Sequence, residues 1–155
     1  MKKLKASAFS VLLIVCFQYT EAQEQKIPFN EPNRNKPKLF NNLPQKMNLK
    51  ISEVEPVLQQ SIGTSVNLKL ADNFLFQGTV ISKSDTPDES VKSIVIRSAS
   101  MQGASFTFSK TKNQDGSFKY IGRIMSRNNG DAYEIKFENG QYILEKKNLY
   151  ELIAE

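Results

Sequence analysis

Basic side chains gather in one stretch of this chain and provide its best candidate for a binding site. Five basic residues are accompanied there by a single acidic one, Asp115; they are Lys110, Lys112, Lys119, Arg123 and Arg127. Ammonium and guanidinium groups bind phosphate, sulfate and carboxylate groups. We therefore expect this stretch either to bind an anionic glycan, a lipid head group or an acidic protein surface, or to be a solvated basic face.

Aromatic residues are interleaved with this basic cluster. Phe118 and Tyr120 alternate with polar residues, and the pattern resembles the single-strand nucleic-acid platform of an OB-like barrel. The same alternation is typical of side chains that face a core, and the export signal described below also argues against nucleic acid. We expect no nucleic-acid partner.

Carboxylates offer a second chemistry. Asp131, Glu134 and Glu138 lie close together in the sequence, and paired carboxylates catalyse glycoside hydrolysis. We expect Asp131 to lie in a turn and to bond its own backbone, with Glu134 on the polar face of a strand. A weak carboxylate-based hydrolase is therefore only the second alternative.

Calcium needs only oxygen ligands, and two stretches supply them. One contains Asn128, Asn129, Asp131 and Glu134, and the other contains Asp85, Asp88 and Glu89. Neither has the spacing of an EF-hand, and ordinary turn residues account for both. No cofactor is expected, with calcium as the alternative.

The composition excludes most other catalytic machinery. The chain has no histidine or tryptophan, and its one cysteine is Cys16. Serine–histidine and cysteine–histidine pairs are excluded, and the usual ligands of transition metals are missing. No glycine-rich phosphate-binding loop is present. We expect a protein that is not an enzyme.

The first 22 residues have the pattern of a secretory signal peptide. Lys2, Lys3 and Lys5 precede an apolar run over residues 6–17, and Thr20 and Ala22 are small residues at the spacing of a cleavage site. Cleavage after Ala22 would lower the net charge from +5 to +3. The sequence predicts a periplasmic or secreted protein without a transmembrane span in its mature chain.

The segment around Cys16 resembles a bacterial lipoprotein signal. Such signals carry a small residue before the cysteine, whereas Val15 stands there. A lipid anchor at Cys16 is therefore not expected.

Residues 23–46 are expected to form an extended linker or arm. They include four of the six prolines, Pro28, Pro32, Pro37 and Pro44, and proline disfavours packed helices and central strands. The segment is either a solvated spacer or a docking arm that pairs residues 27–29 or 39–40 with a sheet edge.

Residues 47–155 are expected to form an antiparallel β domain. A short helix carrying Val54, Leu58 and Ile62, with its start at Ser52 or Glu55 and its end at Gly63, is followed by alternating strands. Gly78 suggests a bulge, and Asn139–Gly140 is typical of a tight hairpin. The fold class is therefore mainly β, with a single antiparallel sheet rolled into a small barrel or sandwich.

These observations lead to a ranked expectation of function. The first is an exported, non-enzymatic module that binds another envelope or secreted protein, for example as an inhibitor or chaperone-like partner of a secreted hydrolase. The alternative is a β-barrel that binds a glycan or an amphiphile through its aromatic interior or its basic hairpin.

Overall fold

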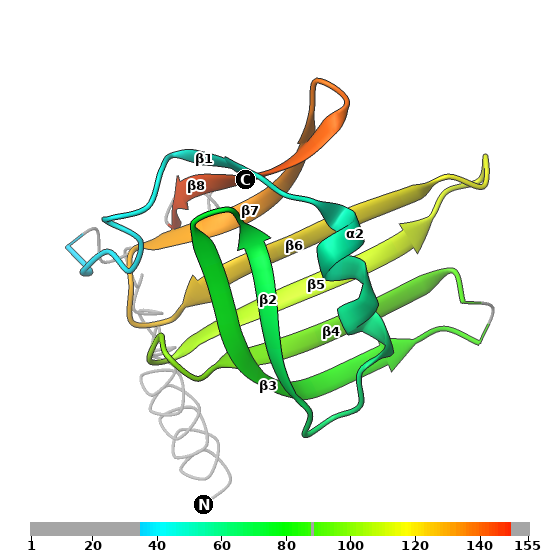
Figure 1. Ribbon diagram of the computed structural model, residues 1–155, viewed down its shortest axis with the longest axis horizontal. Helices are drawn as coiled ribbons and strands as arrows, with labels where there is room; N and C mark the ends of the chain where they lie inside the picture. The colour runs from blue at the N-terminus through cyan, green and yellow to red at the C-terminus, as the bar shows by residue number, and fades with distance from the viewer. Residues whose placement is uncertain (1–34, 88, 150–155) are drawn as a thin grey trace, which may run out of the picture. The chain divides into compact units, whose positions relative to one another are not determined.

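One curled antiparallel sheet makes up most of the structure (Figure 1). The computed structural model describes residues 35–87 and 89–149. Eight strands lie in the order β1-β8-β7-β6-β5-β4-β3-β2. They are β1 (Lys46–Asn48), β2 (Ser65–Ala71), β3 (Phe74–Asp85), β4 (Val91–Ser98), β5 (Ala104–Lys112), β6 (Phe118–Ser126), β7 (Asp131–Glu138) and β8 (Gln141–Asn148).

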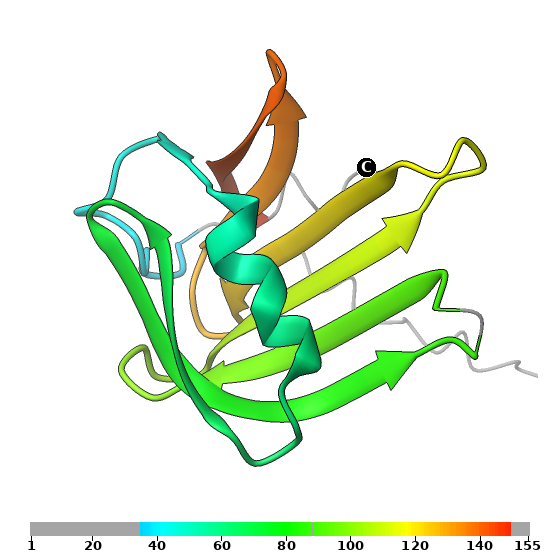
Figure 2. The ribbon, with the colours of Figure 1, turned by 45° about the vertical axis from the view of Figure 1, so that its right-hand side comes forward.

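A short helical segment crosses the concave side of the sheet (Figure 2). It consists of α2 (Ile51–Val54), followed without a break by a turn of 3-10 helix, η1 (Glu55–Gln59). The predicted mainly β fold with one antiparallel sheet and one short N-terminal helix is confirmed. The sheet curls into a half-barrel, and two stacked sheets are not formed.

The details of the helix differ from the prediction. Val54 and Leu58 are buried as expected, but the helix ends at Gln59, so Ile62 lies beyond it and is exposed. The helix begins at Ile51, one residue before the expected start at Ser52, and no side chain caps it at Lys50. Pro56 lies at the start of η1, where its missing N–H costs nothing, and the helix changes type there.

Alternation along the strands places the core on the concave side. Phe106 and Phe108 on β5, Ile94 and Ile96 on β4, and Phe76 on β3 are all fully buried. Strand residues alternate between the two faces of a sheet, so the side chains between them point away from the helix. Of the two aromatic residues that were expected to face the core, Tyr120 packs partly buried against it, whereas Phe118 is exposed, so the expectation for Phe118 is wrong.

The bulge in β3 lies three residues after the predicted position. The pairing of β3 with β4 shifts between Val80 and Ser82, whereas Gly78 pairs regularly with Ser98. Gly78 is required for a different reason: a Cβ atom there would lie 2.3 Å from the carbonyl oxygen of Arg97. The tight hairpin at Asn139–Gly140 is confirmed, with φ angles of 52° and 80°.

Residues 35–45, which belong to the expected arm, pack against the sheet. The Phe40 side chain is fully buried and contacts the rings of Phe74 and Tyr133. The backbone N–H groups of Leu39 and Phe40 donate hydrogen bonds to the Asp131 carboxylate. Leu39 and Phe40 are therefore fixed to β7 and are not a free docking arm, while residues 27–29 lie outside the described residues.

Candidate functional site

The structure divides the five basic residues of the predicted cluster between the two faces of the sheet. Lys110 and Lys112 alternate with Thr111 on β5 and share the concave face with Phe108. Lys119 and Arg123 on β6 alternate with Tyr120 and Ile124 and therefore point to the convex face. All five surround the β5–β6 hairpin, but only two of them face the helix.

Lys110 lies in a polar pair beneath the helical segment. Its ammonium group donates a hydrogen bond of 2.5 Å to the Glu55 carboxylate and lies 3.8 Å from the centre of the Phe118 ring. The hydrogen bond from Lys110 lowers the pKa of Glu55. Burial, together with the nearby Glu55 carboxylate, raises the pKa of Tyr120 to about 12. Glu55 is therefore ionised and Tyr120 neutral at neutral pH.

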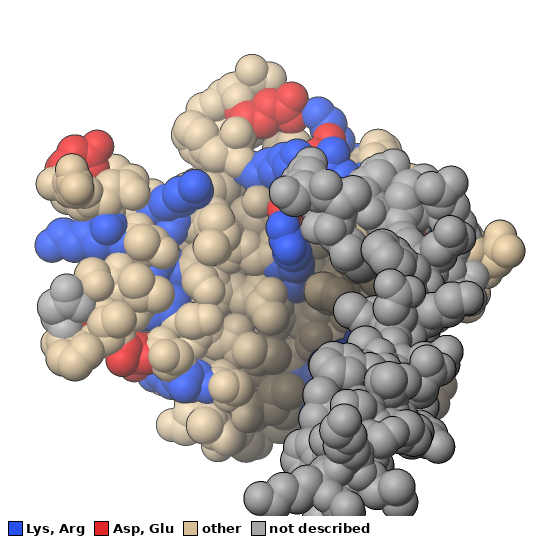
Figure 3. Space-filling model, turned by 180° about the vertical axis from the view of Figure 1, so that it is seen from behind, with Lys and Arg blue, Asp and Glu red and all other residues tan. Residues whose placement is uncertain are grey.

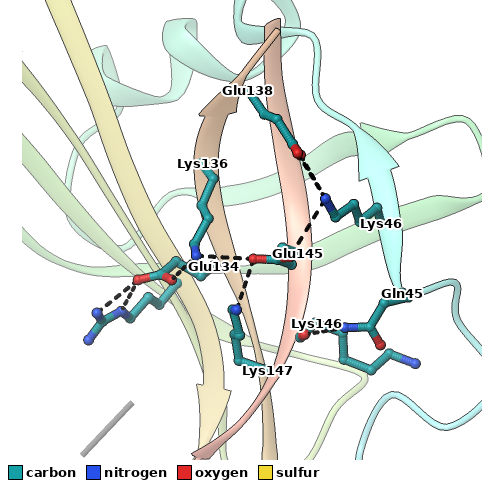
Figure 4. A network of polar contacts seen from close by, with 9 residues as sticks. Gln45, Lys46, Glu134, Lys136, Glu138, Glu145, Lys146 and Lys147 are labelled. Carbon is teal, nitrogen blue, oxygen red and sulfur yellow. Dashed lines mark hydrogen bonds and ion pairs between the residues drawn. The ribbon is translucent and has the colours of Figure 1, made fainter. Parts of the chain in front are cut away.

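A network of ion pairs on the convex face includes Glu134, Lys136 and Glu145 (Figure 4). The guanidinium group of Arg123 donates two hydrogen bonds to Glu134, of 2.9 and 3.1 Å. Glu145 on β8 lies 3.1 Å from the ammonium groups of both Lys136 and Lys147. Partial burial opposes ionisation of Glu145, but these lysines outweigh it and lower its pKa. The network connects β6, β7 and β8, so Arg123 has a structural role in the sheet.

Lys119 and Arg127 lie on the same convex face without forming a common patch with Lys110. The Arg127 side chain lines a hollow that also contains Arg97 and Met125. Seen from behind, basic side chains lie in separate groups with uncharged surface between them (Figure 3). Over the part of the convex face that is visible in Figure 3, the basic side chains do not form one continuous patch.

The three candidate catalytic carboxylates do not face a common cleft. Asp131 is buried, and its two oxygens accept the backbone hydrogen bonds from Leu39 and Phe40. Glu134 pairs with Arg123, and Glu138 pairs with Lys46 on β1. The expectation that Asp131 bonds its own turn is wrong, because it begins β7 and its partners lie about ninety positions away.

Most of the residues proposed for calcium already have other partners. Asn129 donates a hydrogen bond to the carbonyl oxygen of Pro37. Asp85 pairs with Lys83, Glu89 pairs with Lys92, and Asp88 lies outside the described residues. Within residues 35–87 and 89–149, no three acidic side chains come close enough to hold a metal ion.

Sequence reasoning missed an opening in the sheet, at the point where β6 and β7 separate. Their pairing covers three positions only, from Arg123–Glu134 to Met125–Ala132. In the described chain, Phe118–Gly122 have no strand partner on the β7 side, and the β7–β8 hairpin rises away from the β5–β6 hairpin (Figures 1 and 2). We call these five residues and the facing Ile135–Glu138 the β6–β7 fork.

Exposed apolar side chains flank the fork on both faces. Phe137 on the concave face is 65% exposed, and Ile121 on the convex face is 48% exposed. Phe118, at the start of β6, is also exposed. The sequence held a signal for this surface: Tyr120 and Ile121 are adjacent, and two apolar neighbours on one strand cannot both face the core.

A tyrosine side chain bridges the two sides of the fork. Tyr142 on β8 stacks edge-on against Tyr120, with ring centroids 5.4 Å apart, and contacts Phe137 at 4.9 Å. Its hydroxyl oxygen accepts a hydrogen bond of 3.2 Å from the backbone N–H of Tyr120. The Tyr142 side chain thus provides the acceptor for a backbone N–H group of β6. In a continuous sheet, a backbone carbonyl of the next strand would be that acceptor.

Comparison with known proteins provides no assignment. No protein-family model matches the chain, and no curated protein or solved structure matches it. In the described residues, no helix has the length and apolar character needed to cross a membrane. The function must therefore be argued from the surfaces described above.

Proposed function

We propose that this protein is a non-enzymatic, exported binding module that takes up an extended segment of another envelope or secreted protein at the β6–β7 fork. The observation that carries this proposal is the short pairing of β6 with β7, which leaves Phe118–Gly122 without a strand partner on the β7 side in the described chain. An open strand edge is a template for pairing with another chain.

The exposed side chains at the fork fit an extended segment. Successive side chains of a strand point to opposite faces of a sheet. A strand between β6 and β7 would therefore place alternate side chains against Phe137 on one face and Ile121 on the other, both of which are exposed. Burial of such apolar side chains contributes the favourable free energy of docking.

The charges near the fork favour a segment with acidic residues. Lys119 points to the convex face beside Ile121, and no ion pair joins it to any residue that the structure describes. Complementary charge increases the rate of encounter and selects among partners. The preferred segment therefore alternates apolar with acidic side chains.

Site-specific photo-crosslinking in native envelope and secreted fractions tests this proposal. The crosslinkable residue benzoylphenylalanine replaces Phe137 in one variant and Ile121 in another. Leu75 on β3 is the matched control, because it is also an exposed apolar side chain but lies far from the fork in the strand order. We expect the same partner to crosslink at positions 121 and 137.

The identified partner then allows a quantitative test. We expect Phe137→Ser to weaken its affinity by about tenfold or more, as for a central apolar contact, whereas Leu75→Ser leaves it unchanged. Equal crosslinking at position 75, or no crosslinking at positions 121 and 137, would show that the fork is not the docking site.

A further inference from the structure

A second surface, separate from the fork, lies beneath the helical segment. A pocket of about 310 Å³ is bounded by η1, the loop before β4 and the end of the β5–β6 hairpin. Its volume is at the lower end of the range for small-molecule sites. Three lysines line it: Lys92, Lys110 and Lys112.

The strand register brings these lysines together. Lys92 on β4 lies directly opposite Lys110 on β5, and Lys112 follows two positions later on the same face. The side chains of Lys92 and Lys110 are only 18% and 21% exposed. Like charges directly opposite each other destabilise a sheet, so this arrangement requires compensating negative charge.

The described residues supply only part of that compensation. Glu55 pairs closely with Lys110 inside the pocket. Glu89 lies 3.3 Å from Lys92, but its side chain is 76% exposed, and an exposed pair of this kind is weak. Lys112 has no ion pair with an acid among residues 35–87 and 89–149. The described residues that line the pocket therefore carry one more positive than negative charge.

We propose that this pocket binds a small oxyanion, a carboxylate, sulfate or phosphate group, with Lys112 and Lys92 as its donors. An ammonium group is a compact charge with three donors and binds such oxygens from several directions. Phe118 and Pro87 add apolar walls beside the lysines. These walls accommodate an oxyanion carried on a sugar or another organic group as well as a free ion.

Titration with inorganic phosphate and with methyl glucuronide, followed by backbone amide chemical shifts, tests this inference. We expect saturable shifts at residues 89–92 and 110–112 with at least one of the two probes. Phosphate alone would indicate a phosphate-type ligand. Acetate, which has a carboxylate but no sugar, is titrated for comparison. Tighter binding of the glucuronide than of acetate would indicate that the sugar contacts the apolar walls.

The two faces of the hairpin provide a matched pair of variants. Lys112→Gln removes a charge from the pocket, whereas Lys119→Gln removes one from the convex face opposite Thr111. We expect Lys112→Gln to weaken binding about fivefold, as for one partly solvated charge pair, and Lys119→Gln to leave it unchanged. Equal weakening by both variants, or shifts that do not saturate in the unmodified protein, would overturn the proposal.

Discussion

At the residue scale, one carboxylate holds together two distant parts of the chain. Asp131 accepts hydrogen bonds of 2.6 Å from the N–H of Leu39 and 2.9 Å from that of Phe40. Buried backbone donors need partners, and a charged acceptor makes such bonds stronger. The carboxylate therefore fixes the segment that carries Phe40 into the core.

We predict that Asp131→Asn lowers the free energy of unfolding by about 1–3 kcal/mol. The amide keeps one acceptor oxygen but turns an NH₂ group toward a backbone donor, which leaves that buried donor unsatisfied. Urea unfolding followed by circular dichroism measures the change. Asp72→Asn is the control, because the Asp72 side chain is 88% exposed, and a similar loss in both variants would contradict the assigned role.

The Glu55–Lys110 pair predicts a pH dependence of stability. The hydrogen bond from Lys110 lowers the pKa of Glu55 below its usual value of 4.5. A carboxyl group with a lowered pKa in the folded state stabilises the protein above pH 4.5, and this contribution is lost as pH falls through the folded-state pKa.

We therefore expect the unmodified protein to be more stable than Glu55→Gln at neutral pH, with the difference shrinking as the pH falls below 4.5. The difference is small, because Glu55 is only partly buried. Urea unfolding of both proteins over a pH series measures it. A difference that stays constant into the acid range would show that the pair does not stabilise the fold through its charge.

At the scale of the elements, the close approach of β3 and β4 depends on Gly78. A Cβ atom at this position would lie 2.3 Å from the carbonyl oxygen of Arg97 and 2.8 Å from the Ile96 side chain. Both atoms belong to a packed strand and cannot move away easily.

We predict that Gly78→Ala costs more than about 2 kcal/mol of stability through overpacking. Gly116→Ala is the comparison, because Gly116 has a φ of +85° but nothing within 4 Å of the added Cβ, so its cost is about 1 kcal/mol of backbone strain. Thermal unfolding ranks the two variants, and a larger loss for Gly116→Ala would contradict the packing argument.

The contact that bridges the fork gives a prediction for Tyr142. Removal of its hydroxyl in Tyr142→Phe leaves the backbone N–H of Tyr120 without the acceptor seen in the structure. We expect the Tyr120 amide to exchange with solvent at least several-fold faster, since its protection depends on that one bond. Amide exchange measured by NMR checks this, with the amides of the β5–β6 pairs as an internal reference.

Local patterns predicted most elements well. The single antiparallel sheet and the hairpin at Asn139–Gly140 are as expected, because strand alternation and residues that tolerate positive φ angles can be recognised in the sequence. The end of the helix at Gln59 and the separation of β6 from β7 were not predicted, because both depend on contacts between distant segments.

The candidate site was predicted only in part for the same reason. Lys110 and Lys112, which the sequence grouped together, both line one pocket, but the third lysine of that pocket, Lys92, comes from a different strand. The sequence contains no pattern that predicts the contact of Lys92 with Lys110. Their proximity follows from the register of β4 with β5, which only the folded sheet defines.

At the scale of the whole molecule, part of the expected arm contributes to the core. Phe40 is fully buried, and Lys146 on β8 donates hydrogen bonds to the carbonyl oxygens of Phe40 and Leu43. Tyr133 donates another to the carbonyl oxygen of Pro44. The proline-rich composition predicted an irregular backbone, but it did not predict that this backbone is hydrogen-bonded to β7 and β8.

We predict that a chain beginning at Asn35 unfolds cooperatively, whereas a chain beginning at Met47 is strongly destabilised. Loss of a buried phenylalanine alone costs about 3–5 kcal/mol, which is a large share of the stability of a small domain. Thermal unfolding of the two chains measures the difference. Equal stability would show that residues 35–46 are dispensable for folding.

The most direct test of the proposed function compares amide hydrogen exchange in the free protein with exchange in the complex with the partner that crosslinking identifies. We predict that the partner slows amide exchange in Phe118–Gly122 and in the facing part of β7, because an incoming strand covers the open β7 side of β6 and offers backbone acceptors there. Protection confined to β2, the strand at one outer edge of the sheet, with β6 unchanged, would contradict docking at the fork.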